Sequence, residues 1–417
     1  MFRVAILKLT AFCNLNCSYC YMFNSADLTY QCVERNMSLQ VALACLDRIR
    51  EHAGANQLPD FRLTMHGGEP TLWPLENFRA FLHHAELLRK DGLNLAISLQ
   101  TNGVRFPDGL LELFADYEVS LGISLDGPRD YHDAFRVTHG GRGSYDRIMN
   151  NLETLLASDY RGLVGGFLSV ANPDIPPRDY LAWVDSLPIR RFDVLWPMQF
   201  HYASPPWARG EEAAYSREPR YGKWFAELFH AWWERDDPTL YVRFFFDVIQ
   251  TLMGWPKHIE NIVNDTVPIF VVNTDGVVEY HDYFRAAGDG LTRTSMNVLT
   301  HTLDEVAADP VFDYLLNLRS HLPDECQECR FRRICGGGFL PGRMEPGQMP
   351  PRRRSVLCYD EYYFFNEIAR MVGPALGPGN AWLSPLREVF GRSAVDPGPP
   401  APMMELTPAA LAASIPT

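Results

Sequence analysis

The sequence predicts an α/β fold built around a parallel sheet, and two observations lead to this prediction. From residue 3 to about residue 235, six short apolar runs alternate with six amphipathic helical patterns, which is typical of repeated βα units. Polar motifs stand directly after several of these runs, where parallel strands would end and where such folds bind their ligands. The alternation fits either a parallel barrel or an open sheet.

The apolar runs give the strands, and the periodic segments between them give the helices. The predicted strands are Val4–Leu9, Phe61–Met65, Leu95–Leu99, Ser120–Leu125, Leu163–Val170 and Phe192–Pro197. The predicted helices are Ser38–His52, Pro74–Lys90, Asp108–Ala115, Tyr145–Ala157, Arg178–Ser186 and Tyr221–Glu234. Residues 268–283 indicate a β-hairpin that turns at Asp275-Gly276. The aromatic, proline-bearing residues 201–260 are either ordinary core or one wall of a substrate cavity.

Charge and hydropathy exclude several classes of protein. The 51 acidic residues exceed the 38 basic ones and give a net charge of −13, which argues against a broad surface for duplex nucleic acid or anionic lipid. No run approaches the roughly 20 apolar residues of a membrane-spanning helix. The apolar amino terminus leads into a cysteine cluster rather than a cleavage site, so we expect a soluble, cytoplasmic protein with no nucleic-acid or membrane partner.

The nine cysteines are the most informative residues of the sequence. An odd number in a long chain without a signal peptide favours metal ligation or catalysis over a disulfide framework. Seven of them fall into two groups, and two stand apart. Cys45 lies in a helical pattern, where it is expected to act as a small buried apolar residue, and Cys32 lies in a loop-like stretch.

The first group, Cys13, Cys17 and Cys20, offers three thiolates directly after the first predicted strand. A zinc site usually has four protein ligands, and no fourth ligand is close in sequence, although a distant one remains an alternative. Three cysteines on a cubane iron–sulfur cluster instead leave one iron without a protein ligand, where a substrate or cosubstrate can bind.

The segment CNLNCSYCY, residues 13–21, resembles the signature of radical S-adenosylmethionine (SAM) enzymes. In that family the amino and carboxylate groups of SAM bind the open iron of a 4Fe-4S cluster, and cleavage of SAM yields a 5′-deoxyadenosyl radical. Three further motifs match the family in order: HGGEP at residues 66–70, QTNG at residues 100–103 and GISLDGP at residues 122–128. The implied fold is a partial (β/α)6 barrel of the TIM-like, radical SAM type.

The resemblance assigns SAM contacts residue by residue. Gly67 and Gly68 let the backbone approach the SAM amino group, and Glu69 accepts a hydrogen bond from it. The other implied contacts are Asn102 and Ser124 with the ribose or carboxylate, Arg136 with the carboxylate, and Tyr19 beside the adenine.

The second group, Cys326, Cys329, Cys335 and Cys358, has spacing that by itself suits a structural zinc ion. It resembles the SPASM extension of radical SAM peptide maturases, which carries two auxiliary clusters on seven cysteines. Here His281 and Phe339 stand at two of the three missing positions, and all three belong to the first auxiliary cluster. The resemblance therefore implies one auxiliary 4Fe-4S cluster, held by all four cysteines.

This reduced pattern is similar to that of the FxsB/GrrM-type maturases, which form cyclophanes in ribosomally made precursor peptides. The implied reaction removes a hydrogen atom from a side-chain β-carbon and joins that carbon to an aromatic ring. Asp282 stands where sulfatase-maturing relatives carry an acid/base aspartate, so it is nominated as the catalytic proton acceptor. A carboxylate that caps the 275–283 hairpin is the alternative role.

The expected organisation has four parts: a radical SAM core at 1–235, a bridging region at 236–319, a SPASM-like cluster domain at 320–371 and a Pro/Ala-rich tail at 372–417. The expected partners are the precursor peptide and an electron donor of the flavodoxin or ferredoxin type. No room is expected for an amino-terminal leader-binding domain, and Arg352–Arg354 is either a solvated loop or a contact for an acidic leader. One alternative function is formylglycine formation on a sulfatase. Sulfatase-maturing relatives retain the first auxiliary cluster, which this sequence lacks, and this argues against that alternative. The other alternative is a non-catalytic protein, either an iron–sulfur redox sensor or a zinc-stabilised scaffold.

Overall fold

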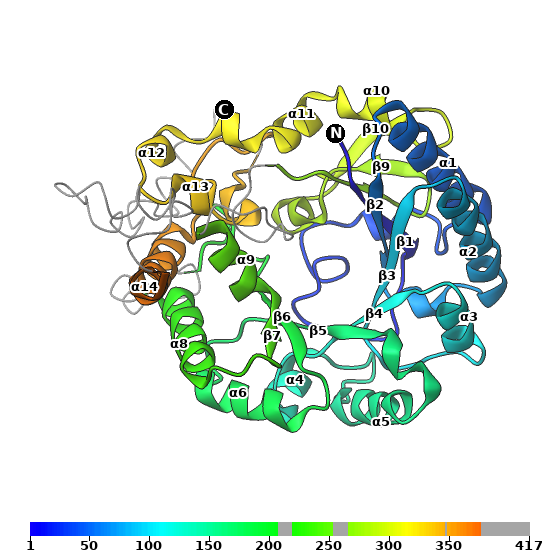
Figure 1. Ribbon diagram of the computed structural model, residues 1–417. Helices are drawn as coiled ribbons and strands as arrows, with labels where there is room; N and C mark the ends of the chain where they lie inside the picture. The colour runs from blue at the N-terminus through cyan, green and yellow to red at the C-terminus, as the bar shows by residue number, and fades with distance from the viewer. Residues whose placement is uncertain (207–218, 253–265, 347, 377–417) are drawn as a thin grey trace. The chain divides into compact units, whose positions relative to one another are not determined.

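The computed structural model describes residues 1–206, 219–252, 266–346 and 348–376 of the chain (Figure 1). Two compact units emerge from the contacts. The first contains residues 1–170, 183–195 and 266–318, and the described residues of the second are 171–182, 196–206, 219–252, 319–346 and 348–376. The hairpin at 268–283 therefore belongs to the first unit, although the sequence placed it in a separate bridging region. The four-part division at 235, 319 and 371 stays a prediction.

The first unit is built on a sheet with the strand order β10-β9-β8-β1-β2-β3-β4-β5-β6. Strands β1 to β6 are parallel, β8 pairs in parallel with β1, and β9 runs antiparallel to both β8 and β10. The strands are β1 (Val4–Thr10), β2 (Asp60–Gly67), β3 (Asn94–Thr101), β4 (Ser120–Ser124), β5 (Val164–Val170), β6 (Arg191–Leu195), β8 (Ile269–Val272), β9 (Val277–Glu279) and β10 (Arg293–Asn297).

Helices of this unit lie on the outer side of its parallel strands (Figure 1). They are α1 (Leu39–Ala55), α2 (Leu75–Lys90), α3 (Leu110–Asp116), α4 (Arg129–Phe135), α5 (Tyr145–Leu156), α10 (Leu303–Ala307) and α11 (Pro310–Leu316), and α6 (Pro177–Ser186) is shared between the units. Strand β2 shows how the sequence sets this layering: Phe61, Leu63 and Met65 are buried, and the alternate Thr64 and His66 are polar. Because side chains alternate along a strand, one face takes the apolar core and the other takes the polar groups.

All six predicted strands and all six predicted helices are present, with ends that differ by at most three residues. The hairpin is confirmed as well: β8 and β9 flank a turn in which Gly276 has φ of 80°, a left-handed conformation that glycine adopts without strain. Helices α4, α10 and α11, strand β10 and, in the second unit, the helices Arg243–Leu252 and Cys358–Leu376 were not predicted. Most of these elements are short and carry too little periodicity to read, but Cys358–Leu376 is 19 residues long and lies beyond residue 235, after which no helix was predicted.

The second unit has an aromatic core between helices α8 (Arg220–Arg235), α9 (Arg243–Leu252) and α14 (Cys358–Leu376), with the short strand β7 (Tyr241–Val242) before α9. Phe225 lies 4.4 Å from Trp196 and 5.3 Å from Phe244 between ring centroids, and Phe244 stacks on Phe364 at 5.3 Å. Such aromatic pairs stabilise a core by more than the burial of their apolar surface alone contributes. For the described residues of 201–260, ordinary core packing explains the aromatic composition.

Gly222 on α8 makes close packing of α8 against α14 possible. A Cβ atom at this position would lie 2.2 Å from the carbonyl oxygen of Asp360, and the Gly222 N–H donates to the Asp360 carboxylate at 2.8 Å. Residues 207–218, 253–265, 347 and 377–417 lie outside the described residues, and so does most of the predicted Pro/Ala-rich tail. None of the helices in the described part of the chain is long and apolar enough to cross a membrane.

Candidate radical SAM site and cysteine clusters

The first cysteine group lies on the loop that follows β1. The Cys20 N–H donates to the Cys17 carbonyl at 3.0 Å, and the Leu15 N–H donates to the Cys13 sulfur at 3.4 Å. Burial raises the pKa of Cys13 to about 12 and that of Cys17 to about 11. Thiols so placed become thiolates only beside a strong positive charge, and the iron ions of a cluster supply such a charge. The donor set therefore fits a cluster with three cysteine ligands.

In the described parts of the chain, no three Cys, His, Asp or Glu side chains are grouped tightly enough to hold a single metal ion. A single zinc ion at about 2.3 Å from each sulfur draws its cysteines to within about 4 Å of one another. The cysteines of a cubane cluster each bind a different iron, so they stand further apart.

The glycines at the end of β2 allow a close contact between two backbone segments. A Cβ atom on Gly67 would lie 2.6 Å from the Thr10 carbonyl oxygen, and one on Gly68 would lie 2.1 Å from that of Phe12. The Gly68 N–H donates to Thr10 O at 2.8 Å, and the Glu69 N–H donates to Phe12 O at 3.0 Å. The glycines thus fix the start of the cysteine loop, and their contact with the SAM amino group stays a prediction.

Glu69 is almost fully buried and joins the ends of β2 and β3. Its Oε1 accepts from the Thr71 N–H at 3.1 Å and from the hydroxyls of Thr71 and Thr101 at 2.8 and 2.7 Å. Its Oε2 accepts from the Asn102 N–H at 2.8 Å. Burial raises the pKa of this carboxyl, and the hydrogen bonds oppose the rise. Oε2 keeps room for a second donor, which the predicted bond from the SAM amino group would use.

Asn102 and Ser124 lie at the carboxyl ends of β3 and β4, as the resemblance implied. The Asn102 side-chain amide donates to Asn14 at 2.7 Å and lies 3.6 Å from the Cys13 sulfur, so it links β3 to the cysteine loop. The Ser124 hydroxyl accepts from the Gln100 amide at 2.9 Å. Both residues are placed near the loop or strand ends that a bound cofactor would contact, and their SAM contacts are untested.

Arg136, Tyr19 and Asp126 form a buried polar cluster. An Arg136 guanidinium N–H donates to the Tyr19 hydroxyl at 2.8 Å and lies 3.6 Å from the Asp126 carboxylate, to which Tyr19 also donates. The Nε of Arg136 is buried without a hydrogen-bond partner. A buried guanidinium N–H without an acceptor suits a site that takes a carboxylate ligand. Asp126 was missed as a site residue, although it stands in the matched GISLDGP segment.

A second buried cluster surrounds Asp282. The ammonium group of Lys8, on β1, donates to Asp282, lies 3.1 Å from the Tyr21 hydroxyl and lies 3.3 Å from His66 Nδ1. Tyr21 also donates to Asp282 at 3.2 Å. The Arg285 guanidinium donates to the other Asp282 oxygen at 3.2 Å. The alternative role for Asp282, capping the hairpin, does not hold, because its carboxylate binds these cations instead.

Electrostatics fix the charge states in this cluster. Burial raises the pKa of Asp282, but Lys8 and Arg285 outweigh that effect and hold it well below its usual range. Burial lowers the pKa of Lys8 against the pull of Asp282, and burial together with Lys8 lowers that of His66 to about 3. His66 is therefore neutral. Its Nδ1 accepts from the Gly67 N–H at 2.8 Å, which assigns the proton to Nε2.

Sequence reasoning missed Lys8, Tyr21, His66 and Arg285. A lysine inside an apolar run was the one available signal, because a buried lysine needs a partner. That partner, Asp282, lies 274 residues away.

The second cysteine group lies in the second unit, on short elements before and at the start of α14. Cys326 is on α12 (Asp324–Gln327), Cys335 ends α13 (Arg332–Cys335) and Cys358 begins α14. Burial raises the pKa of Cys335 and of Cys358. As in the first group, soft, desolvated thiols suit iron–sulfur ligation.

The loop after Cys335 has three consecutive glycines, Gly336 to Gly338, with φ of 62°, 89° and 88°. Within this left-handed run the Gly338 N–H donates to the Cys335 carbonyl at 3.2 Å, and Phe339, at one of the missing cysteine positions, is buried. The Phe339 N–H donates to the buried carboxylate of Glu361 at 2.7 Å. Burial raises the pKa of Glu361 to about 7, and this residue carried no sequence signal that identified it.

Comparison with known proteins agrees with this geometry. Residues 7–179 match the profile of the Radical SAM superfamily. This segment is a radical SAM domain, and the chain is a SAM-dependent, peptide-modifying enzyme. Its cofactors are SAM and iron–sulfur clusters.

Two curated relatives are similar to most of this chain. One is the serine-type anaerobic sulfatase-maturating enzyme of Bacteroides thetaiotaomicron, 24% identical over 88% of this chain and 89% of that protein. The other is the cysteine-type anaerobic sulfatase-maturating enzyme of Clostridium novyi, 26% identical over 85% of this chain and 92% of that protein. The similarity therefore extends well beyond the radical SAM domain.

Solved structures show the same fold. Native anSMEcpe with bound AdoMet has a TM-score of 0.74 at 21% identity, over 90% of this chain and 99% of that one. Streptococcus suis SuiB bound to its precursor peptide SuiA has a TM-score of 0.57 at 14% identity, over 86% of this chain and 76% of that one. These structures confirm the radical SAM α/β fold with a SPASM-like carboxyl-terminal region. The FxsB/GrrM-type subfamily has no counterpart among these relatives, so that finer assignment is not established.

Proposed function

We propose that this radical SAM enzyme modifies a peptide by removing a hydrogen atom from a side-chain β-carbon. The supporting observation is that most of the chain, including parts of both compact units, is similar to anaerobic sulfatase-maturating enzymes. As their names say, these enzymes act on a protein, a sulfatase. A related fold occurs with a bound peptide in native anSMEcpe with the Cp18Cys peptide, at a TM-score of 0.74.

We infer the following cofactor ligands. Cys13, Cys17 and Cys20 hold the cluster that binds SAM, and Cys326, Cys329, Cys335 and Cys358 hold one auxiliary cluster. The cofactor pair supplies a hydrogen-abstracting 5′-deoxyadenosyl radical when bound. The protein orients SAM through the guanidinium of Arg136 and the carboxylate of Glu69, which burial and hydrogen bonding hold in fixed positions.

Asp282 is the proposed proton acceptor. Its low pKa makes it a weak base, but it also keeps the carboxylate ionised and ready at neutral pH. A carbon centre or aromatic ring that has already lost an electron is a strong acid, and such a group gives its proton even to a weak base. Lys8 and Tyr21 orient the carboxylate through their hydrogen bonds.

Two products remain, and different observations favour them. We favour a carbon–carbon crosslink to an aromatic residue, because His281 and Phe339 stand where the SPASM pattern has cysteines of the first auxiliary cluster. Formylglycine formation is the second candidate, since the curated relatives are sulfatase-maturating enzymes.

The test is an anaerobic reaction of reconstituted enzyme, reductant and SAM with either a precursor peptide encoded beside the gene or a sulfatase peptide. A crosslink removes two hydrogen atoms, leaves no aldehyde and suppresses fragmentation between the joined residues in tandem mass spectrometry. Formylglycine reacts with a hydrazide tag. Iron incorporation without 5′-deoxyadenosine release would instead favour the redox-sensor alternative.

A further inference from the structure

Two histidines of the first unit flank Asp282, one from each side of β1. The strand register places His66, on β2, beside Lys8 of β1, and Lys8 in turn donates to Asp282. His281 follows β9 and directly precedes Asp282, where it is the N-cap of the short 3-10 helix η4 (Asp282–Ala287). An imidazole therefore stands on either side of the proposed proton acceptor.

Backbone N–H groups fix the tautomer of both rings. His66 Nδ1 accepts from the Gly67 N–H at 2.8 Å, and His281 Nδ1 accepts from the Tyr283 N–H at 3.2 Å. Burial lowers the pKa of His66 to about 3 and that of His281 to about 4, so neither ring is charged at neutral pH. A neutral imidazole whose Nδ1 accepts a hydrogen bond carries its proton on Nε2. Each ring therefore presents one N–H donor.

Both Nε2–H donors are available to a ligand. Neither has an acceptor among the described residues, and neither is one of the polar atoms buried there without a partner, so both atoms are accessible. The rings are also held in place: the Tyr283 ring lies 3.6 Å from the His281 ring between centroids, and the Lys8 ammonium lies 3.3 Å from His66 Nδ1. A fixed N–H group to which the protein offers no acceptor suits the recognition of an acceptor on a ligand.

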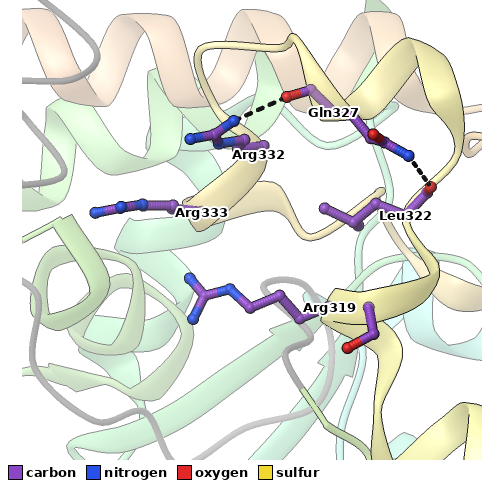
Figure 2. Close-up of a pocket in the computed structure, with 6 residues that line it drawn as sticks. Arg319, Leu322, Gln327, Arg332 and Arg333 are labelled. Carbon is purple, nitrogen blue, oxygen red and sulfur yellow. Dashed lines mark hydrogen bonds between the residues drawn. The ribbon is translucent and has the colours of Figure 1, made fainter.

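The arginines around a cavity of the second unit differ from the two histidines, because they already interact with other groups of the protein. This cavity has a volume of about 590 Å³ and is lined by Arg319, Ser320, Leu322, Gln327, Arg332 and Arg333 (Figure 2). An Arg332 guanidinium N–H, for example, donates to the Gln327 carbonyl at 3.1 Å. The accessible donors of His66 and His281 therefore give the clearer indication of a ligand.

The described charged groups around the two histidines carry no net positive charge. Three carboxylates and two cations form buried ion pairs there, namely Asp27, Glu279 and Asp282 with Lys8 and Arg285. Arg293 lies 3.7 Å from Glu279, but it also binds the carboxylate of Asp275 at 2.7 Å. A carboxylate ligand would add to this excess of negative charge, whereas an uncharged carbonyl oxygen accepts N–H bonds without that cost. The two donors therefore favour the amide carbonyl groups of a peptide.

We propose that His66 and His281 bind amide carbonyl groups of the peptide substrate through their Nε2–H donors, and so hold the peptide beside Asp282. This inference rests on the proposed function, because it takes the substrate to be a peptide. It gives a binding role to His281, which stands where the SPASM pattern has a cysteine. It also requires the site to prefer uncharged acceptors over carboxylates.

Nitrogen NMR of the imidazole rings tests the two donors without any reaction. The sample is the SAM-bound, cluster-containing enzyme with isotope-labelled histidine, kept anaerobic and unreduced, and the signals of His66 and His281 are assigned by their loss in variants. At neutral pH we expect both rings to be uncharged and protonated on Nε2. The probe is N-acetylglycine N′-methylamide, a single residue with amide carbonyls on both sides. This probe should shift both Nε2 signals, and acetate at the same concentration should leave them unchanged.

Asparagine and glutamine at the two positions separate ligand binding from a structural role. Asparagine places its oxygen near the position of Nδ1 and keeps the bond from the backbone N–H, but it has no donor near the position of Nε2, whereas glutamine keeps that donor and loses the acceptor. His66→Asn and His281→Asn should each weaken binding of the probe about fivefold, read from the signal of the remaining histidine, and the two Gln variants should stay within about twofold of the wild type. For any peptide that the enzyme modifies, KM should follow the same order, with a smaller change in kcat. A purely structural role predicts the reverse order.

The matched control is His83→Asn, which changes an exposed histidine of α2 and should bind the probe like the wild type. Protonation of either ring on Nδ1, an equal response to the probe and to acetate, or Asn variants that bind the probe as tightly as the wild type would overturn the proposal. Weaker SAM binding by the Asn variants in equilibrium dialysis would also overturn it, and would assign the donors to SAM. If the probe binds in the expected way but no peptide is ever modified, the two donors stand and the proposed function fails.

Discussion

The Asp282→Asn substitution tests the buried cluster around Lys8 most directly. The side chain of Lys8 has no exposed surface, and Asp282 is its charged partner. Removing one member of a buried ion pair costs about 3 to 5 kcal/mol, because the remaining charge is left in a poorly solvated site. The ammonium keeps Tyr21 at 3.1 Å and His66 at 3.3 Å, and Arg285 keeps the carboxylates of Asp27 and Glu279. We therefore expect a loss near the lower limit, about 3 kcal/mol at pH 7.

The pH dependence gives the prediction a sign. Burial lowers the pKa of Lys8 from its usual value even with Asp282 present, and loss of the carboxylate lowers it further. A lysine with a depressed pKa destabilises the folded state while it is protonated, and this cost fades as the pH rises toward 10.5, its ordinary pKa. The deficit of the variant should be largest near neutral pH and should shrink as the pH approaches 10. In the wild type, the depressed pKa of Asp282 adds stability above pH 3.8, its ordinary pKa, and this is lost in acid.

Anaerobic thermal and urea unfolding of the cluster-containing protein provide the measurement. A loss of about 3 kcal/mol lowers the melting temperature by on the order of 5 °C. The control is Asp60→Asn, which breaks a half-exposed ion pair with Arg3 and should cost less than about 1 kcal/mol. The double variant Lys8→Met with Asp282→Asn removes both charges and should recover part of the loss. A single Asp282→Asn variant as stable as the control, or a deficit that does not change with pH, would refute the reasoning.

Three further predictions concern the cofactor sites. Gly68→Ala places a Cβ atom 2.1 Å from a backbone oxygen, so it should abolish 5′-deoxyadenosine release, whereas Gly54→Ala, with nothing within 4 Å, should leave release unchanged. Cys13→Ser should lower the iron content, seen by metal analysis, and should abolish SAM cleavage. Its control, Cys45→Ala, should keep the iron content and SAM cleavage of the wild type. Because Cys45 is fully buried, this control should lose about 1 kcal/mol of folding stability, seen by unfolding. Arg136→Gln should weaken SAM binding at least tenfold in equilibrium dialysis, and unchanged binding would contradict its proposed role with the SAM carboxylate.

The parallel strands and their helices were predictable because their signal is local. In β2 the alternation of Phe61, Leu63 and Met65 with polar residues marks one strand without reference to the rest of the chain. The cysteine motifs were equally readable, since Cys13, Cys17 and Cys20 lie within eight residues. Helix α4 was missed although α3, which is also seven residues long, was predicted, because α3 buries Leu110, Leu113 and Phe114 at helical spacing whereas α4 buries only His132.

The buried charges could not be predicted, because their partners come from distant parts of the sequence. Lys8 and Asp282 meet because β1 lies between β2 and β8, and the turn after β9 then returns the chain to the end of β1. The spacing of residues in the sequence does not indicate this order of strands in the sheet. The glycine contacts were only partly predictable as well. The sequence indicated a close backbone approach at Gly67 and Gly68, but only the fold shows that they approach the carbonyl oxygens of Thr10 and Phe12.

The charges around Asp282 also constrain the order of steps in the proposed reaction. A carboxylate shared between Lys8 and Arg285 is ionised at neutral pH, and it is too weak a base to take a proton from an unactivated carbon. Once a one-electron oxidant has taken an electron from the substrate radical, the same carbon, or the ring joined to it, is a strong acid. The charged residues around Asp282 therefore favour a reaction in which electron transfer precedes proton transfer. With Asp282→Glu, which retains the charge but displaces the carboxylate, product formation should slow while 5′-deoxyadenosine release continues. Equal slowing of both would instead place Asp282 in the positioning of SAM or substrate.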